Sequence, residues 1–562
     1  MAKTTGAKLF AQMMQGYGIT HIFYVPNVLS KALVAMEGMD IRRVVAHSEK
    51  AAAYMADGYA RARGGPGVCA AQPIGASNLA SGLRDAFMAR SPVIAISGGP
   101  AVASRYRHAY QEVEDFEQFS GVTKANLNVD SPARLPDLLR QAFRTATSGM
   151  PGPVHLRFQG RASDVPLGDL DAEPLVEKQF ATVPPFRPEP EAERIREAAA
   201  LLAKAAKPLI LAGGGVVSSQ AQREVVELAE KLQIPVATSL NGKGTILDTH
   251  PLSVGVTGTY SRECANRALT EAELIFLVGC PAGGMVTTNW ASIRPGTAVI
   301  QLDIEATELG RNYPNKVALL GDAKVALRRL IEAAKPVEGT TKAWVQRVQQ
   351  LVKDWRDKTT PNWNSDATPI HPARICKELT DALPANGVVV SDTGHAGMWT
   401  SQMVDLRQPT QRYIRCAGSL GWGLPGAIGV KCALPDRPVL CFTGDGGMYY
   451  HMTELETALR YGINLVVLVN NNQALSQEFP SLNRNYDGKP YGRSDELWRF
   501  SEFNFAKVAE AMGCVGMRVE QPGQIKGALQ EAFGVNGKPV IVEVMSDVKE
   551  MAPNAWVPQP QQ

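Results

Sequence analysis

A strand–helix–strand pattern near the carboxyl end constrains the fold more than any other part of the sequence. Val439–Phe442 is a short apolar run, and Leu465–Val469 is a second, continuous one. Between them apolar residues recur every three or four positions, as in an amphipathic helix that Gly462 stops: Met448, Met452, Leu455 and Leu459. Continuous apolar runs are typical of parallel strands buried on both faces. The pattern predicts an α/β fold with a parallel sheet.

Polar residues follow both predicted strands. Gly444-Asp445-Gly446 comes after the first strand and Asn471-Asn472 after the second. Loops after parallel strands open on one sheet edge, where α/β proteins bind ligands, so we expect Asp445 and Asn472 to converge. Hard oxygen ligands beside a glycine turn suit magnesium and a diphosphate. Alone, however, Gly-Asp-Gly is more often an ordinary turn, and a second motif is needed.

The remaining chain repeats the same alternation in three blocks. We expect doubly wound parallel-sheet domains at residues 1–183, 191–345 and 368–550. The Pro-rich passage 183–190 is predicted to be an extended linker. The polar segment Asp354–Asp366, which contains Pro361, is predicted to be a second linker, and the tail after Pro558 to be disordered.

Bulk composition excludes several classes of protein. Lys and Arg number 58 against 55 Asp and Glu, with no basic stripe, so no nucleic-acid partner is expected. No apolar run approaches the ~18 residues of a membrane span, and the amino end lacks a signal-peptide core. The eight cysteines form no Cys-x-x-Cys pair. We therefore expect a cytoplasmic enzyme without membrane association, zinc or disulfides. Gly213-Gly214-Gly215 is not Gly-x-Gly-x-x-Gly and is interpreted as a loop.

A second motif lies in the first block. His47-Ser48-Glu49 precedes an alanine-rich stretch, 51–61. Ser48 is predicted to cap this helix and to leave Glu49 in its first turn. Considered alone, Glu49 would be interpreted as a solvated acid at the end of a helix.

Together the motifs resemble the thiamine-diphosphate-dependent decarboxylase and carboligase superfamily, most closely its acetolactate synthase-like branch. The resemblance spans nearly the whole chain and rests on Glu49 with its helix, Pro73–Asn78, Tyr110-Gln111-Glu112, Gly258-Thr259-Tyr260, Asp392-Thr393-Gly394, Gly418–Gly429 and the Asp445–Asn472 unit. It implies a pyrimidine-binding, a central and a diphosphate-binding domain, in that order. It also implies self-association as a dimer or tetramer, because the cofactor lies between the first domain of one subunit and the third of its neighbour.

The resemblance also implies the roles of the site residues. Asp445, Asn472 and the carbonyl of Ala474 would bind Mg²⁺. Leu420 would wedge beneath the cofactor and bend it, and the Gly418 carbonyl would accept a hydrogen bond from its aminopyrimidine. The full cofactor-binding set is Pro26, Asn78, Gly394, Gly418, Leu420, Gly444, Asp445, Gly446, Gly447, Asn472, Ala474 and Leu475.

By the same resemblance, Glu49 and Gln111 are the catalytic candidates. Glu49 would hydrogen-bond the pyrimidine ring of thiamine diphosphate, and its carboxyl group should be buried against apolar surface, which raises its pKa. The cofactor would then decarboxylate a 2-oxo acid. The fragment that remains would be protonated or transferred to an aldehyde or oxo-acid acceptor. Gln111 matches a glutamine that lines the active site.

Three segments depart from the branch. Val25–Leu29 lacks the usual Gly-Gly pair, so Asn27 and Val28 are predicted to approach the substrate. Ala474–Pro480 lacks the usual tryptophan, and Pro281–Val286 replaces the arginines that contact FAD, so FAD binding is doubtful. The expected substrate pocket comprises Asn27, Val28, His108, Ser476 and Phe479. We therefore expect a relative with altered substrate scope.

Two alternatives remain open. One is a lyase of the 2-hydroxyacyl-CoA or oxalyl-CoA type, whose central domain can bind a nucleotide. The other is a non-catalytic cofactor-binding subunit. The presence of both Glu49 and the complete metal motif favours an enzyme.

Overall fold

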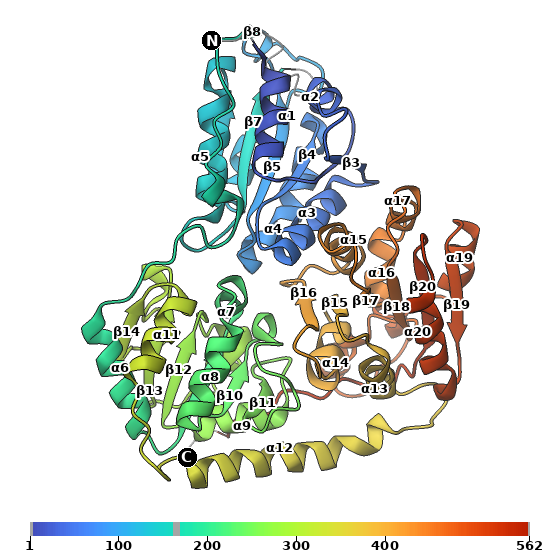
Figure 1. Ribbon diagram of the computed structural model, residues 1–562. Coiled ribbons are helices and arrows are strands. Elements are labelled where there is room, and N and C mark those ends of the chain that lie inside the picture. Colours follow the sequence, from blue (N-terminus) through green and yellow to red (C-terminus); the bar gives the residue numbers. More distant parts are fainter. Residues whose placement is uncertain (1–3, 161–168, 560–562) are drawn as a thin grey trace.

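The computed structural model describes residues 4–160 and 169–559, which form three α/β units that each contain a six-stranded parallel sheet. Figure 1 shows the three units around a common centre, with the amino-terminal unit in blue, the central unit in green and the carboxy-terminal unit in orange and red. The predicted α/β fold class is confirmed. Part of the predicted tail, residues 560–562, lies outside the described residues.

In the amino-terminal unit the strands lie in the order β3-β2-β4-β5-β7-β6. Their bounds are β2 His21–Tyr24, β3 Arg42–Val45, β4 Gly67–Ala71, β5 Val93–Gly99, β6 Ala125–Val129 and β7 Val154–Gln159. The helices are α1 Gly6–Gly16, α2 Ser30–Ala35, α3 Glu49–Arg63, α4 Ala76–Ala89 and α5 Leu135–Thr147. A small antiparallel ribbon pairs β1 Thr4–Thr5 with β8 Asp169–Leu170.

The central unit has the order β11-β10-β9-β12-β13-β14. Its strands are β9 Pro208–Ala212, β10 Val236–Thr238, β11 Ser253–Val256, β12 Leu274–Val278, β13 Ala298–Asp303 and β14 Val317–Leu320. Its helices are α6 Ala192–Lys204, α7 Gly214–Ser218, α8 Gln222–Leu232, α9 Glu263–Glu271, α10 Gly284–Thr287 and α11 Ala323–Ala333.

The carboxy-terminal unit has the order β16-β15-β17-β18-β20-β19. Its strands are β15 Val388–Ser391, β16 Arg412–Arg415, β17 Val439–Gly444, β18 Val466–Asn471, β19 Val515–Val519 and β20 Val540–Met545. Its helices are α13 Pro372–Ala382, α14 His395–Met403, α15 Gly423–Ala433, α16 Asp445–His451, α17 Glu454–Arg460, α18 Phe479–Asn485, α19 Phe505–Ala511 and α20 Ile525–Gly534.

The strand order positions the site. In each sheet the chain starts on an inner strand, goes to one side and then returns to the other, which creates a switch point where ligands bind in α/β folds. The switch lies between β2 and β4 in the first unit and between β15 and β17 in the third. The loops after β2 and β4, and those after β15 and β17, therefore face the two crevices.

Close backbone packing joins the first and third units. α3 lies against α15, where a Cβ on Gly58 would overlap the Gly426 carbonyl and one on Gly429 would overlap the Met55 carbonyl. The alanine-rich sequence of α3 thus serves a tight helix–helix contact. That contact fixes the helix that begins at Glu49 against the carboxy-terminal unit.

Three local predictions are wrong. The segment predicted as a second linker is mostly helix α12, Lys342–Trp363, which runs from the central to the carboxy-terminal unit in Figure 1. Buried side chains at intervals of three or four residues hold it, namely Trp344, Val348, Leu351, Trp355 and Thr359. The single helix predicted after β17 is two short helices, α16 and α17. Ser48 stands at the N-cap of α3, but its side chain makes no capping hydrogen bond.

No helix within residues 4–160 and 169–559 is long and apolar enough to cross a bilayer. All eight cysteines are buried and unpaired.

Candidate functional site

Asp445 is the buried acid at the β15–β17 switch point. Its Oδ1 accepts the Gly446 N–H at 2.8 Å, and its Oδ2 accepts the Ala474 N–H at 2.9 Å. Asp445 is 3% exposed, and burial raises the pKa of its carboxyl to about 6. No Lys, Arg or His of the described chain forms an ion pair with it. A buried carboxylate without a counter-charge favours a cation from outside the chain.

Asn472 directly follows the neighbouring strand and is buried. Its Nδ2 donates to Ser476 Oγ at 2.9 Å, which leaves Oδ1 free of that bond. Ser476 Oγ also lies 2.8 Å from Nδ1 of His395, at the start of α14. Burial lowers the pKa of His395 to about 4, so the imidazole is neutral at pH 7. The predicted convergence of the two loops is seen directly in the Asp445–Ala474 hydrogen bond.

Asn471 supports this loop from behind. Its Nδ2 donates to Glu543 at 2.7 Å, and its Oδ1 accepts the Gln473 N–H at 3.1 Å. Asn471 therefore points into the unit, whereas Asn472 bonds to Ser476 of the following loop.

Glycines make room around Asp445. A Cβ on Gly446 would come within 2.5 Å of Leu475 Cδ2, and one on Gly447 within 2.5 Å of Thr443 Oγ1. Gly418 and Gly444 differ, since a Cβ on Gly418 would meet nothing within 4 Å and one on Gly444 only the Asn470 carbonyl at 4.0 Å. These two glycines border open space, as a diphosphate cradle requires. Gly394 adopts φ 68°, which favours glycine, and lies beside the Gln477 side chain.

Asp392 organises the adjoining loop from the end of β15. Its carboxylate accepts N–H groups from Thr393 at 2.7 Å, Gly421 at 3.1 Å and Gly423 at 2.9 Å. Leu420 directly precedes Gly421 and is half-exposed. Burial nevertheless raises the pKa of Asp392 to about 6.

We expect Asp392 to lower the free energy of unfolding as pH rises. Its folded-state pKa of about 6 lies above the ordinary 3.8, so the folded protein holds the proton more tightly than the unfolded chain. Its contribution to the free energy of unfolding is fully present below pH 4 and is lost by about pH 6, a change of about 3 kcal/mol. Unfolding of wild type and Asp392→Asn across this range should show the difference between them shrinking as pH rises. A difference that is constant with pH would contradict the assignment.

Asp85, from α4 of the first unit, holds the loop before Leu420. Its carboxylate accepts the N–H groups of Ala417 at 2.8 Å, Gly418 at 3.1 Å and Ser419 at 3.0 Å. It also pairs with Arg61 at 3.0 Å, and Arg61 in turn pairs with Asp57 at 2.6 Å. A buried ionic cluster thus orients the Ala417–Ser419 backbone, which directly precedes Leu420.

Replacing Asp85 with asparagine should destabilise the protein by about 3 to 5 kcal/mol, because it breaks a fully buried ion pair and turns an amide toward three N–H donors. Urea unfolding would measure the loss, and the affinity for thiamine diphosphate should fall with it. Asp137→Asn, at an exposed ion pair of α5, is the matched control. An unchanged midpoint would contradict the proposed support of the loop.

Glu49 begins α3 at the edge of the amino-terminal sheet. Asn78 Nδ2 donates to its Oε2 at 3.1 Å, and Gly75 is the residue whose missing side chain makes room for the carboxylate. The expected burial is not seen in the single chain, where Glu49 is half-exposed. In the described structure no hydrogen bond or ion pair joins Glu49 to Asp445 or Asn472. Within the described chain the two predicted halves of the site therefore make no direct polar contact.

The other predicted residues are spread along the same edge. The Pro26 carbonyl accepts from Gln72 at 3.3 Å, and Asn27 is exposed with its Oδ1 bonded to Ser30 at 2.6 Å. Val28 is 1% exposed within the hydrophobic core, so the prediction that it approaches the substrate is wrong. Its side chain packs in the core of the amino-terminal unit and not at the surface. His108 is exposed and Gln111 half-exposed, both in the loop after β5.

Sequence reasoning missed Trp498. Its ring lies 4.6 Å from that of Phe479, and its carbonyl accepts the Leu475 N–H at 2.7 Å. A tryptophan is thus present beside the segment where the motif lacked one, but it comes from a later part of the chain. His395 and Asp85 were also missed, because neither belongs to a local pattern that marks a site.

A buried acid that lacks a counter-charge, at one sheet switch point, and a glutamate at a helix start, at another, indicate an α/β enzyme with a metal and a diphosphate cofactor. The comparisons specify the class further. Residues 4–119 match the thiamine pyrophosphate enzyme N-terminal TPP binding domain, residues 195–330 the central domain and residues 392–544 the C-terminal TPP binding domain.

Full-length relatives give the branch. A probable acetolactate synthase large subunit of Methanocaldococcus jannaschii is 32% identical over 98% of this chain and 93% of its own length. The acetolactate synthase isozyme 3 large subunit of Escherichia coli K12 is 30% identical over 98% of this chain and 96% of its own. The chain belongs to the thiamine pyrophosphate enzymes, in the acetolactate synthase-like branch. The predicted class, a thiamine-diphosphate-dependent carboligase or decarboxylase, is confirmed.

Proposed function

We propose that this protein is a magnesium- and thiamine-diphosphate-dependent enzyme that decarboxylates a 2-oxo acid and either protonates the remaining fragment or transfers it to an acceptor carbonyl. The observation that carries the proposal is the buried carboxylate of Asp445 without a counter-charge, hydrogen-bonded to the loop of Asn472. Thiamine diphosphate, when bound, supplies an electron sink for decarboxylation.

Oxygen atoms of the carboxy-terminal unit would hold the metal. The candidates are Asp445, Asn472 Oδ1 and the carbonyl of Ala474. No group of three or more His, Cys, Asp or Glu residues in the described ranges forms a metal cluster of its own. A set with one carboxylate suits Mg²⁺, which is usually bound through one or two carboxylates together with substrate phosphates.

Glu49 would hold the proton that the reaction moves. We infer that it acts in the site of a second copy, because no hydrogen bond or ion pair joins it to Asp445 within the described chain and because it is half-exposed. Docking against another copy would bury its carboxyl group. Domains 1–183, 191–345 and 368–550 would then be the pyrimidine-binding, central and diphosphate-binding domains of a dimer or tetramer.

The segment after the metal loop would select the substrate. Ser476 is buried and bonded to His395, while Phe479 and Trp498 form an aromatic pair beside Leu475. Packed aromatic side chains exclude water and provide an apolar wall. Gln111, His108 and Asn27 would approach from the other subunit.

A panel of 2-oxo acids tests the proposal. Pyruvate and bulkier 2-oxo acids would be incubated with the holoenzyme, with and without aldehyde acceptors, and carbon dioxide and ligated products measured. We expect carbon dioxide release that requires magnesium. Tight cofactor binding without carbon dioxide from any 2-oxo acid would contradict the proposal.

A further inference from the structure

A cavity of about 840 Å³ lies where the three units meet. It is bordered by the end of α3, by α7, α8 and residues 241–250 of the central unit, and by β16. None of the residues assigned above to the cofactor or substrate lines it. Its volume is within the range of small-molecule sites, which is roughly 300–1,000 Å³.

The cavity is strongly cationic. Seven of its lining residues are Arg or Lys and two are Glu. Three of the cations are paired elsewhere: Arg61 with Asp57 at 2.6 Å, Lys243 with Asp248 at 3.3 Å and Arg90 with Glu308 at 3.8 Å. Among the described residues no carboxylate pairs with the other four, which are Arg63, Arg223, Arg412 and Arg415.

Arg415 is the most poorly compensated of these four cations. It is 6% exposed, and its buried Nε has no hydrogen-bond partner. The guanidinium makes two weak contacts. Its Nη2 lies 3.9 Å from Cys416 Sγ, and its carbon lies 6.0 Å from the centre of the Tyr260 ring. Thr245 Oγ1, also buried on the cavity wall, lacks a partner too. A buried guanidinium without an anion is costly, so the site is incomplete as it stands.

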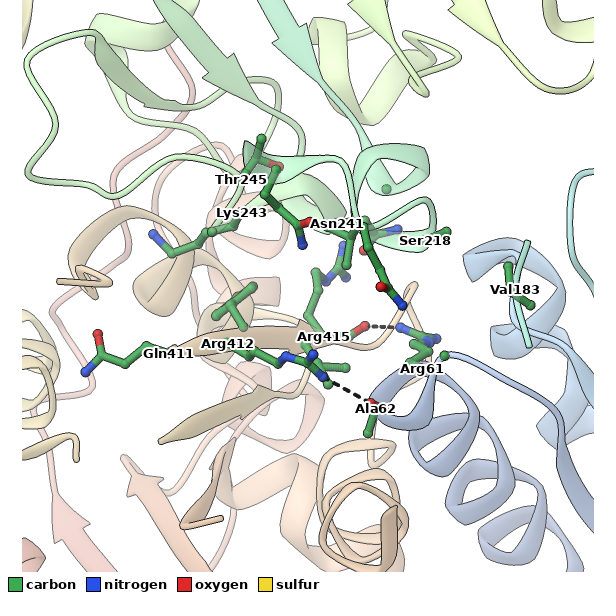
Figure 2. Close-up of a pocket in the computed structure, with 18 of the residues that line it drawn as sticks. Arg61, Ala62, Val183, Ser218, Asn241, Lys243, Thr245, Gln411, Arg412 and Arg415 are labelled. Carbon is green, nitrogen blue, oxygen red and sulfur yellow. Dashed lines mark hydrogen bonds between the residues drawn. The ribbon is translucent and has the colours of Figure 1, made fainter. Parts of the chain in front are cut away.

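Arg412 provides a second cation on the same strand. Figure 2 shows its side chain reaching to the Ala62 carbonyl, which it meets at 3.0 Å, while Arg61 reaches the Arg415 carbonyl. Burial lowers the pKa of Arg412, as expected where no acid compensates the charge. The figure also shows Asn241 and Thr245 on the opposite wall.

The geometry points to a second ligand site in this cavity, which binds a small organic or inorganic anion through Arg415 and Arg412, with Thr245 as a hydroxyl donor. Carboxylate and phosphate share the required chemistry, because both accept charge-assisted hydrogen bonds from guanidinium groups. Since the ligand would bridge the central unit at Thr245 and the carboxy-terminal unit at Arg412 and Arg415, it would bind their docked arrangement better than separated units. It would therefore stabilise that arrangement.

The experiment uses the holoenzyme saturated with thiamine diphosphate and Mg²⁺, so that the cofactor crevice is filled. Inorganic phosphate and malonate are the probes, with sodium chloride at matched ionic strength as the reference. Calorimetry and the thermal midpoint are measured for wild type, Arg415→Met and Arg412→Gln. Arg194→Met, at an exposed arginine of α6 outside the cavity, is the matched control.

We expect one of the two probes to bind wild type and the control and to raise their midpoints above the chloride reference. Whichever probe acts identifies phosphate or carboxylate as the ligand class. Arg415→Met and Arg412→Gln should each weaken binding roughly 10- to 100-fold. Absence of binding by both probes, or equal binding by wild type and both variants, would overturn the proposal.

The anion-free proteins give an independent readout. Arg415→Met removes a buried charge that has no partner, so its midpoint without probe should equal or exceed that of wild type. A markedly lower midpoint, or failure to fold, would show that the charge is already compensated within the protein. Because none of these measurements uses turnover, their outcome is separable from that of the proposed reaction.

Discussion

Asp445→Ala should abolish magnesium-dependent binding of thiamine diphosphate and all turnover with it. The substitution removes the single carboxylate proposed to hold the metal and the acceptor of the Ala474 N–H at 2.9 Å. We expect the cofactor affinity to fall at least about 100-fold, since even residues that only orient a metal ligand typically contribute 10- to 100-fold. Calorimetric titration with cofactor, with and without Mg²⁺, measures the loss.

The matched control for this change is Asp436→Ala. Asp436 is exposed, lies shortly before β17 and should leave cofactor binding unchanged. Without metal, Asp445→Ala should unfold at a thermal midpoint equal to or above that of wild type. Burial raises the pKa of Asp445 to about 6, and its buried charge destabilises the folded protein when no cation is bound. Wild-type cofactor affinity in Asp445→Ala would contradict the metal assignment.

Glu49→Gln should leave cofactor binding within a few-fold and remove catalysis. The glutamine can still accept the hydrogen bond from Asn78, now 3.1 Å, but it cannot hold a proton. Loss of a positioned acid–base group lowers kcat by about 100- to 10,000-fold. Turnover and cofactor affinity are measured on the same preparation.

Glu37→Gln is the control in the same unit, since Glu37 is exposed and its one ion pair among the described residues is with Arg43. It should retain full activity. If Glu49→Gln turned over like wild type, Glu49 would have no part in proton transfer.

The sequence predicted those site residues that belong to short, continuous patterns. Asp445 and Asn472 were predictable because a parallel strand–helix–strand unit brings both loop ends to one edge, where the Ala474 N–H meets Asp445. Glu49 was found because it opens an alanine-rich helix. The expected neighbourhood of Glu49 was not found in one chain, because the proposed partner surface belongs to another copy.

The missed residues depend on tertiary contacts that carry no sequence spacing. Trp498 reaches Phe479 only because the chain returns across the loop that follows β18, with the Phe500 N–H bonded to the Gln473 carbonyl at 2.8 Å. Asp85 is one polar residue in an otherwise ordinary amphipathic helix, and nothing local shows that it accepts three N–H groups from the third unit.

Helix α12 could have been predicted. Its apolar stripe has helical spacing, but Pro361 and the polar outer face were given more weight. The helix continues through Pro361 and ends two residues later, at Trp363. Here the periodicity was the stronger signal.

Complementation between the two inactive variants tests the central claim, a cofactor site that takes Glu49 from one copy and Asp445 from another. Glu49→Gln and Asp445→Ala chains would be unfolded, mixed in equal amounts and refolded together, and carbon dioxide release measured. Random pairing leaves one site in four intact, so the mixture should recover about a quarter of wild-type activity. Each variant refolded alone should stay inactive. A mixture no more active than the separate variants would show that the two residues do not meet across copies.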